Sequence, residues 1–217
     1  MKTFKLSPSS LRLMKECKRC FWLTQHGIWK RPASIFPGLP AGMDRILKTH
    51  FDRFMERGEL PPELCENGEC AGMKLFKDKE KLDKWRNNLK GVRYEDEDGN
   101  ILMGAMDNIL EKEGKLIVFD YKTRGHPVKE DTAKFSQDQL NIYTYLLQKN
   151  GYETEDYAFL LFYIPKEVLE TGEVIFDTKL IKMPVDVKDA EKLWKSALDL
   201  LNGECPAHDS CEWCAGF

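Results

Sequence analysis

Apolar residues follow a helical period in the first part of the chain. Ser7-Pro8 is a preferred helix start, and Leu11, Met14 and Phe21 follow at helical spacing together with two cysteines. The proline- and glycine-rich segment 32–42 predicts the end of that helix. Residues 42–58 predict a second helix, whose apolar stripe comprises Ile46, Leu47, Phe51 and Phe54.

The next two segments are more polar. Residues 59–73 lack periodicity and predict an irregular loop. Residues 74–91 are rich in lysine and arginine and predict an amphipathic helix, whose apolar positions are Leu75, Leu82, Trp85 and Leu89. We favour a solvated helix face as the interpretation of these basic residues, and a surface that contacts DNA is compatible with it.

Continuous apolar runs in the middle of the chain predict strands. The runs ILMGAMDNIL (101–110) and KLIVFDYKT (115–123) are joined by a short turn, which predicts an antiparallel hairpin at the centre of a sheet. The elements that follow are a helix (133–150), two strands (156–164 and 173–183) and a helix (186–202). This order predicts an α/β fold with a central mixed sheet covered by helices on both faces.

The composition fits a single domain. The chain has 217 residues, 42% of them hydrophobic and 32% charged, which is enough for one well-filled core. We predict one domain, 1–217, with a mainly helical region (1–90), a sheet core (91–185) and a C-terminal helix with a cysteine-bearing tail (186–217). A net charge of -3 excludes a global basic field, so any nucleic-acid contact must come from a local patch. No signal-like segment or long apolar run occurs, so we expect a cytoplasmic protein without membrane spans.

Asp120 and Lys122 stand at the end of the apolar run LIVF. Side chains two apart on a strand point to the same face, and burying two ions there costs several kcal/mol per ion unless each is well paired. The two side chains therefore either pair with each other or hold a ligand.

Asp107 brings a second carboxylate to this place, because it interrupts the preceding apolar run. With a hairpin loop of two or four residues, Asp107 lies opposite Asp120 or Val118 and shares a face with Asp120. Adjacent buried carboxylates repel each other, and a divalent cation removes the repulsion. Oxygen ligands favour Mg²⁺ or Mn²⁺, so the two aspartates are candidate metal ligands. The alternative is two unrelated acids at the edge of the core.

Gln139 and Tyr143 are four residues apart in the predicted helix 133–150 and share one face. Beside a metal site they are suited to orient a phosphate or a water molecule. Without such a site they are ordinary half-buried residues.

Two C-x-x-C pairs lie at opposite ends of the sequence. They comprise Cys17, Cys20, Cys211 and Cys214. Four thiolates suffice for a tetrahedral zinc ion or a 4Fe-4S cluster, and either would join the two ends of the fold. Cys205 is the alternate ligand, and unligated buried cysteine is the alternative to a metal site.

These motifs together resemble the PD-(D/E)XK nuclease superfamily, and within it the RecB-like exonucleases, which include the CRISPR-associated exonucleases and the AddB nuclease domain. The resemblance rests on GAMD with Asp107, DYK with Asp120 and Lys122, and Q-x-x-x-Y with Gln139 and Tyr143, in the family's order and spacing. It includes the SPSSLRLMKECKRCFWL opening and the cysteine-bearing tail, so it covers nearly the whole chain. It implies a restriction-endonuclease-like core and metal-dependent hydrolysis of DNA.

The resemblance also implies residue roles. The implied ligands of Mg²⁺ or Mn²⁺ are Asp107, Asp120 and the backbone carbonyl of Tyr121. Lys122 is implied to position or deprotonate the attacking water and to offset charge on the phosphate. The remaining implied catalytic residues are Gln139 and Tyr143, which position the substrate or the lysine.

Two features depart from the family pattern. Related exonucleases place a metal-binding histidine near the position of Ile46, whereas this chain has His50 one helical turn further on. We predict His50 as a ligand, with Asp44 as a weaker substitute and a surface histidine as the alternative. The family's 4Fe-4S cluster usually uses one N-terminal and three C-terminal cysteines, whereas this chain offers two and three.

The sequence thus predicts a DNA nuclease, most simply an exonuclease on single-stranded or free ends, acting in repair, recombination or CRISPR-type processing. Two other function classes stay open. One is a nucleic-acid-binding module that does not cleave, which the intact Asp107, Asp120 and Lys122 disfavour. The other is an adaptor that is stabilised by its cysteine-bound metal and acts with protein partners in a repair or CRISPR complex.

Overall fold

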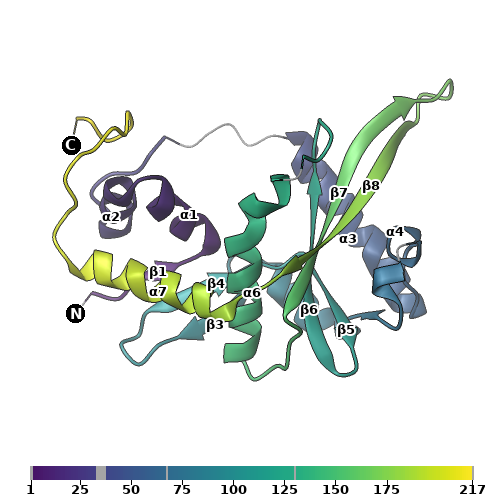
Figure 1. The fold of residues 1–217 in the computed structure, drawn as a ribbon, viewed down its shortest axis with the longest axis horizontal. Helices are drawn as coiled ribbons and strands as arrows, with labels where there is room; N and C mark the ends of the chain where they lie inside the picture. Colours follow the sequence, from purple (N-terminus) through teal and green to yellow (C-terminus); the bar gives the residue numbers. More distant parts are fainter. Residues whose placement is uncertain (1, 33–37, 67, 130, 217) are drawn as a thin grey trace.

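The computed structural model describes residues 2–32, 38–66, 68–129 and 131–216 (Figure 1). The helices are α1 (Pro8–Glu16), α2 (Lys18–His26), α3 (Gly38–Arg57), α4 (Pro62–Cys65), α5 (Lys79–Arg86), α6 (Gln137–Lys149) and α7 (Val187–Asn202), with 3-10 turns η1 (Gly68–Cys70) and η2 (Thr132–Ser136). The strands are β1 (Lys5–Leu6), β2 (Lys74–Leu75), β3 (Val92–Glu95), β4 (Ile101–Gly104), β5 (Asn108–Lys112), β6 (Lys115–Thr123), β7 (Tyr157–Val168) and β8 (Val174–Pro184).

The strands form two mixed sheets. The larger sheet has the order β2-β5-β6-β7-β8 and the smaller one the order β1-β4-β3. β6 runs parallel to β7 and β1 runs parallel to β4, while the other neighbours are antiparallel. The predicted α/β class, with mixed sheets flanked by helices, is confirmed. The run 101–110, predicted as one strand, instead divides at residues 105–107, so that β4 joins the smaller sheet and β5 the larger one.

The hairpin of β5 and β6 has a two-residue loop, one of the two lengths that the sequence analysis found compatible with a shared aspartate face. Glu113 and Gly114 adopt positive φ angles of 51° and 83°, as two-residue hairpin turns with the twist of the flanking strands require. Asn108 pairs with Phe119 in this register, so the next position along places Asp107 opposite Asp120. This register therefore satisfies the condition under which Asp107 and Asp120 share a face of the sheet.

The first predicted helix is two helices. Ser7 begins α1 with a capping box, in which Ser7 and Ser10 bond each other's backbone N–H groups. Cys17 has an extended backbone, with φ -161° and ψ 110°, so it ends α1 and caps α2. Its side chain accepts from the N–H of Cys20. The prediction that both cysteines lie within one helix is wrong because of this break.

The helix α3 begins four residues before the predicted start, since Pro40 lies in its first turn, where a missing N–H costs no helical hydrogen bond. Leu47 and Phe51 are buried as predicted, together with Met55. Ile46 is 52% exposed, so its assignment to the apolar stripe is wrong. Residues 33–37 of the predicted break lie outside the described residues.

Two segments after α3 differ from the predictions. Residues 59–73 contain more regular structure than predicted, and residues 74–91 contain less helix. The predicted loop 59–73 contains α4 and η1, and the predicted helix 74–91 contains β2 and the shorter α5. Leu82 and Trp85 are buried as predicted, whereas Leu89 is 78% exposed, since α5 ends at Arg86.

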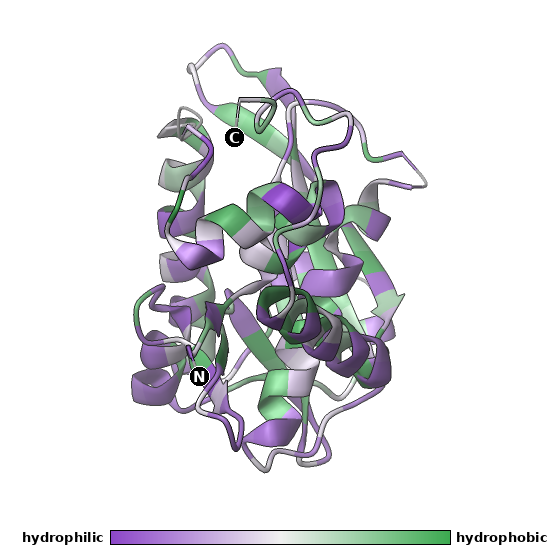
Figure 2. Cartoon of the chain, turned by 90° about the vertical axis from the view of Figure 1, so that its left-hand side faces the viewer, coloured by the Kyte–Doolittle hydropathy of each residue, from purple (hydrophilic) through white to green (hydrophobic). Residues whose placement is uncertain are grey.

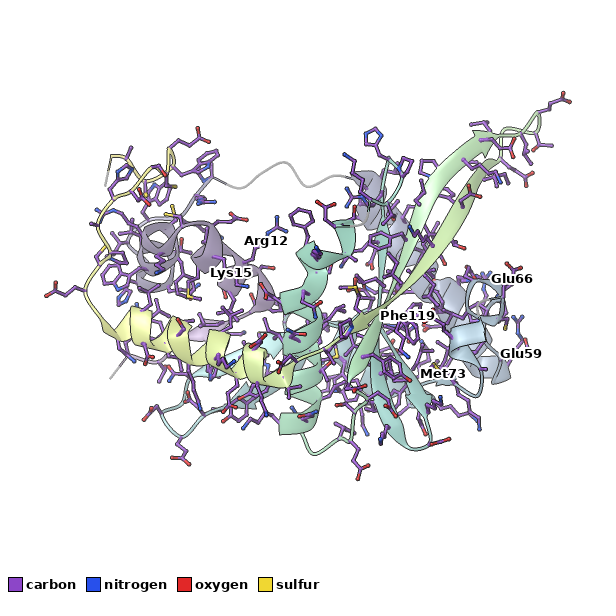
Figure 3. The ribbon with its side chains drawn as sticks, viewed as in Figure 1. Arg12, Lys15, Glu59, Glu66, Met73 and Phe119 are labelled. Carbon is purple, nitrogen blue, oxygen red and sulfur yellow. The ribbon has the colours of Figure 1, made fainter. Side chains whose placement is uncertain are left out.

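The layers pack around β6. α3 contacts one side, where Phe51 meets Phe119, and α6 contacts β6 as well as β3 and β4 of the smaller sheet. The side-chain view shows Phe119 within the sheet layer and Lys15 of α1, whose ammonium lies 2.6 Å from Asp138 of α6 (Figure 3). Hydropathy colouring shows green concentrated on the inner strands and alternating with purple on the helices (Figure 2).

Two further features complete the fold. The hairpin of β7 and β8 is longer than predicted and extends away from the body (Figure 1), with a register shift between Pro165 and Glu167. α7 begins one residue after the predicted start, because Asp186 is its N-cap and accepts from two backbone N–H groups. Every helix among the described residues is too short or too polar to span a bilayer.

Candidate functional site

Asp120 and Lys122 form an ion pair on one face of β6. The Lys122 Nζ lies 2.6 Å from Asp120 Oδ2, and the residue Asp120 is 1% exposed. Burial alone would lower the pKa of Lys122, but the charges of Asp120 and Asp107 outweigh it and raise that pKa. Lys122 is therefore an ammonium in the metal-free protein, and it supplies most of the charge that balances the buried carboxylate.

Asp107 lies in the bend between the two sheets, directly before β5. Its pKa is raised from 3.8 to about 7, first by burial and then by the charge of Asp120, against the opposing effects of Lys122 and Lys48. Each carboxylate thus disfavours ionisation of the other, and a divalent cation bound to both would relieve this repulsion. Asp120 Oδ2 has no hydrogen-bond partner among the described residues, so the Lys122 ion pair is its compensating contact. This donor set fits a divalent cation that keeps water ligands, as Mg²⁺ does.

Two basic residues that the sequence analysis did not assign to the site hold Asp107. Lys48 Nζ lies 3.5 Å from Asp107 Oδ1 and 2.8 Å from Asp44. The Arg86 Nε donates to the backbone carbonyl of Asp107 at 2.7 Å, while its guanidinium also lies 2.7 Å from Asp52. The spacing of Asp44 and Lys48, one turn apart on the α3 stripe with Leu47, is the signal that could have indicated the first of these contacts.

His50 lies on another side of α3. Its Nε2 is 3.0 Å from Glu63, which also accepts from the Tyr163 hydroxyl at 2.7 Å. Two residues along a helix turn the side chain by about 200°, so His50 and Lys48 face nearly opposite directions. Among the described residues, no ion pair or hydrogen bond joins His50 to Asp107 or Asp120. Metal binding by His50 therefore stays a prediction, and Asp44, which pairs with Lys48, is the α3 acid on the side of the helix that faces Asp107.

Gln139 and Tyr143 come together on the side of α6 that faces the site. Gln139 Nε2 donates to the Tyr143 hydroxyl at 2.9 Å. Burial and then the negative charge of Asp120 raise the pKa of Tyr143, so its hydroxyl stays protonated beside the carboxylates. A Cβ at Gly104 would lie 2.5 Å from the Tyr143 ring, so the glycine of GAMD makes room for this tyrosine.

The Tyr121 side chain belongs to the core on the α3 side, where its ring stacks on Phe51 with centroids 5.2 Å apart. Its hydroxyl is buried without a hydrogen-bond partner among the described residues. The predicted role of Tyr121 concerns its backbone carbonyl, and that role stays a prediction.

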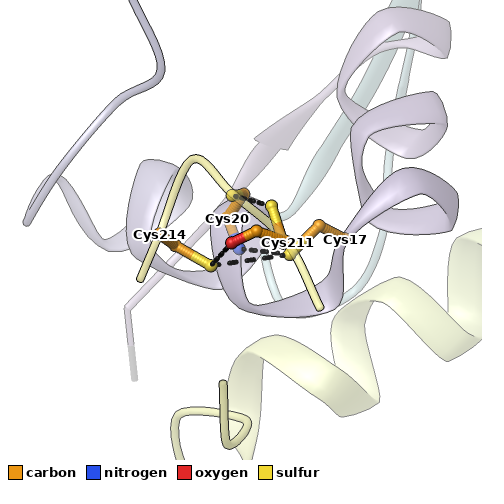
Figure 4. Close-up of side chains that lie close together, drawn as sticks. All are labelled: Cys17, Cys20, Cys211 and Cys214. Atoms are coloured by element: carbon orange, nitrogen blue, oxygen red, sulfur yellow. Dashed lines mark hydrogen bonds between the residues drawn. The ribbon is translucent and has the colours of Figure 1, made fainter. Parts of the chain in front are cut away.

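The four predicted cysteines converge from α2 and the C-terminal tail (Figure 4). Their ligand atoms all lie within 4.8 Å of one another, with the Sγ atoms of Cys17 and Cys214 3.8 Å apart and those of Cys20 and Cys211 3.6 Å apart. A tetrahedral ion with metal–sulfur bonds of about 2.3 Å places its sulfur atoms about 3.8 Å from one another. The cluster therefore has the donors and the spacing of a metal site.

Cys205 lies beside this cluster with different contacts. Its Sγ accepts from Arg19 at 3.4 Å, and the same guanidinium donates to Pro206 O at 2.6 Å. In the part of the chain that the structure describes, the four-cysteine group is also the one set of three or more His, Cys, Asp or Glu ligands that is close enough to hold an ion. The structure thus assembles the symmetric pairs of cysteines and leaves Cys205 outside them.

A comparison with family models identifies the fold. The model that describes the PD-(D/E)XK nuclease superfamily matches residues 5–216. The chain belongs to the PD-(D/E)XK nuclease superfamily.

Other comparisons with this nuclease-superfamily chain are more distant. A solved structure described as "Crystal structure of SSO0001" is 15% identical over 93% of this chain and 79% of that one, with a TM-score of 0.45. A search of curated proteins found no match.

Membership of the PD-(D/E)XK superfamily gives the observed geometry a chemical context. In this nuclease-like chain, β5 and β6 bring Asp107 close to Asp120 and Lys122, and α6 adds Gln139 and Tyr143. Two carboxylates, a fixed ammonium and a hydroxyl around one point can hold a cation, a phosphate and a water molecule together.

Proposed function

We propose that the protein is a metal-dependent DNA nuclease that uses Mg²⁺ or Mn²⁺ and digests single-stranded or free DNA ends. The observation that carries this proposal is the convergence of Asp107 with the Asp120–Lys122 ion pair in a chain of the nuclease superfamily. Its resemblance to the RecB-like exonucleases supports the preference for ends. It also supports use in repair, recombination or CRISPR-type processing, in a cytoplasmic setting that keeps the thiols reduced.

In the proposed reaction, Asp107 and Asp120 would hold the divalent ion, and the bound ion would supply a lowered pKa for its water and stabilisation of charge on the phosphate. Lys122, as an ammonium, orients the attacking water and neutralises part of the phosphate charge. The water oxygen bonds to phosphorus as the bond to the leaving sugar oxygen breaks; the water loses a proton to solvent, and the leaving sugar oxygen takes one up from solvent. Tyr143, held by Gln139, donates from its protonated hydroxyl toward the substrate.

The deciding experiment is cleavage of end-labelled single- and double-stranded DNA with Mg²⁺ or Mn²⁺. We expect a metal-dependent ladder from the wild type and none from Lys122→Ala. Lys115→Ala is the matched control, because Lys115 lies at the other end of β6 and pairs with Glu155 at 3.5 Å. A wild type that binds DNA without cutting it contradicts the nuclease and indicates the non-cleaving binding module. A wild type that neither binds nor cuts indicates the adaptor.

We also propose that the cysteine cluster holds a structural metal ion. The family resemblance favours a 4Fe-4S cluster, whereas the sulfur spacing favours one zinc ion, because four separate irons hold their thiolates further apart than the edges of one tetrahedron. Elemental analysis of protein purified without added metal should give one zinc per chain. Four irons per chain with a brown colour would establish the cluster instead.

A further inference from the structure

A pocket of about 400 Å³ opens beside the proposed active site. Its walls come from β1, the first turn of α1, the end of β4, the residues after α5 and one face of α6. It shares Gln139 and Tyr143 with the active site, and it is lined by Gly104 and Ala105, which lead directly into the bend that carries Asp107. The pocket is therefore continuous with the place where the scissile phosphate would lie.

A second opening lies on the other side of the same bend. It measures about 390 Å³ and is lined by Lys48 and Arg86, the two residues that hold Asp107. Asn87 lines this opening, and the next residue, Asn88, lines the first pocket. Both openings therefore border the bend that carries Asp107, because Lys48 and Arg86 contact Asp107 and Ala105 lies two residues before it.

The chemistry of the first pocket matches a nucleotide. Leu6, Pro8 and Met103 give it apolar walls, while Lys5, Ser9 and Asn88 are exposed polar residues around it. Lys5 forms no ion pair with any described residue, so its ammonium is available to a phosphate. An apolar surface for a base, together with a cation for the backbone, is the usual combination in single-strand binding sites.

The size of the pocket decides between paired and unpaired DNA. At about 400 Å³ it lies near the lower end of the range of roughly 300–1,000 Å³ for small-molecule sites. This volume accepts one nucleotide and is too small for a base pair with both backbones. A duplex must therefore open at this position before its strand can enter.

We propose that this pocket binds one unpaired nucleotide of the substrate strand next to the scissile phosphate, with Lys5 on the adjoining phosphate. This inference rests on the proposed nuclease function and deepens it, because it assigns the substrate class of the site to unpaired strands. The protein then binds single-stranded DNA and frayed ends in preference to blunt duplex.

The test is equilibrium binding of a fluorescein-labelled oligothymidylate, followed by anisotropy, with all variants built on Asp120→Asn to prevent cleavage. Ser9→Trp fills the pocket from an exposed helix position, and we expect it to weaken binding at least about fivefold, since stacking of one base contributes about 1–3 kcal/mol. Ser196→Trp is the matched control, because Ser196 is an exposed serine on α7 and does not line the pocket. Thermal unfolding of each variant checks that both proteins are folded.

A second pair of variants tests the phosphate contact. Lys5→Ala should reduce the slope of log binding constant against log salt concentration by about 0.7, the value for one phosphate on single-stranded DNA. Lys2→Ala, which removes the same charge three residues earlier and outside the pocket, should leave the slope unchanged.

The outcomes separate this inference from the nuclease proposal. If Ser9→Trp binds the oligonucleotide as tightly as Ser196→Trp, the nucleotide pocket is overturned even where the wild type cleaves DNA. If Ser9→Trp and Lys5→Ala weaken binding but the wild type cleaves nothing, the pocket stands and the nuclease proposal fails.

Discussion

The carboxylate site and the cysteine cluster both gather metal-binding side chains, but they are balanced in different ways without a metal. Asp120 and Asp107 have lysine partners, at 2.6 Å and 3.5 Å. The cysteines mainly meet one another. Burial raises the pKa of Cys214 to about 12, whereas the pKa of Cys211 is lowered to about 6 despite burial, because the Trp213 N–H and neighbouring thiols stabilise its thiolate. Lysines therefore balance the carboxylates at the first site, whereas the second site has, among the described residues, one guanidinium, that of Arg31 at 3.6 Å from Cys211 Sγ, for four thiols.

Because of this difference, metal binding should have different consequences at the two sites. At the carboxylates, the proposed metal would add chemistry to a place where Lys122 and Lys48 already contact the acids. At the cysteines, it neutralises thiolates that cannot all ionise without it, so its binding free energy contributes to folding. Removing one metal should therefore affect activity, and removing the other should affect stability.

The largest expected effect is on activity at the carboxylate site. Asp120→Asn should lower the rate of DNA cleavage by about 10⁴-fold or more, equivalent to about 5.5 kcal/mol of transition-state stabilisation. Its thermal unfolding should stay close to that of the wild type, because the amide retains the shape of the carboxylate. Comparable cleavage by wild type and variant would remove Asp120 from the site.

The next effect is on stability at the cysteine cluster. Cys20→Ser should lower the free energy of unfolding by about 5 kcal/mol, because the metal closes a loop of nearly the whole chain. For a chain of this size, this corresponds to a Tm decrease of about 10–20 °C. Cys65→Ser, an exposed cysteine outside the cluster, is the control and should unfold like the wild type.

Cys205 sharpens this measurement. If the ligands are the four converging cysteines, Cys205→Ser should retain the metal content of the wild type and a Tm close to its value. A loss as large as that of Cys20→Ser would instead make Cys205 a ligand.

A pH effect of intermediate size should distinguish the carboxylates from the cysteines. The pKa of Asp107 is raised from 3.8 to about 7, mainly by burial and then by Asp120. The folded state therefore holds a proton that the unfolded state releases between these values, so the free energy of unfolding should fall as pH rises through this range. The fall is at most about 4 kcal/mol and should be absent in Asp107→Asn.

Denaturant titrations in EDTA measure this dependence. Asp138→Asn is the control, since Asp138 is a surface acid that pairs with Lys15. An unchanged slope in Asp107→Asn would assign the titration to another group. Excess Mg²⁺ should reverse the fall, because it takes the place of the proton.

The smallest effect concerns the fit between Gly104 and Tyr143. Gly104→Ala should destabilise the fold by about 1–3 kcal/mol, because the added methyl group meets the buried ring. It should also slow cleavage by displacing the Tyr143 hydroxyl, while leaving the cysteine-bound metal in place. Gly42→Ala, at an open helical position, should be neutral or slightly stabilising. Equal cleavage rates for the two variants would show that Tyr143 does not act in the reaction.

Local pattern was enough to predict the centre of the site. The two-residue turn at Glu113-Gly114 sets the register of β5 and β6, and that register alone aligns Asp107 with Asp120. The spacing of Gln139 and Tyr143 likewise depends on one helix. The cysteine pairs were found because the C-x-x-C spacing is typical of metal-binding thiols.

Contacts that depend on tertiary packing were missed. Lys48 and Arg86 reach Asp107 only because α3 and α5 approach the same bend, and nothing in their local sequence states where those helices pack. The hydrophobic periodicity of the run 101–110 also does not indicate that the run divides between two sheets, because both halves are buried. Ile46 was wrongly assigned to the buried stripe, because α3 directs its side chain toward solvent.

The convergence of the cysteines also bears on the order of events during synthesis. Cys17 and Cys20 leave the ribosome almost two hundred residues before Cys211 and Cys214. The first pair therefore stays reduced while the strands are synthesised, because only two of the four thiols of the cluster are present. Packing of the C-terminal tail and binding of the proposed metal are then the last steps of folding. A nascent chain arrested before Cys211 should therefore contain the formed hairpin of β5 and β6, whereas its α2 should lack contacts with the tail.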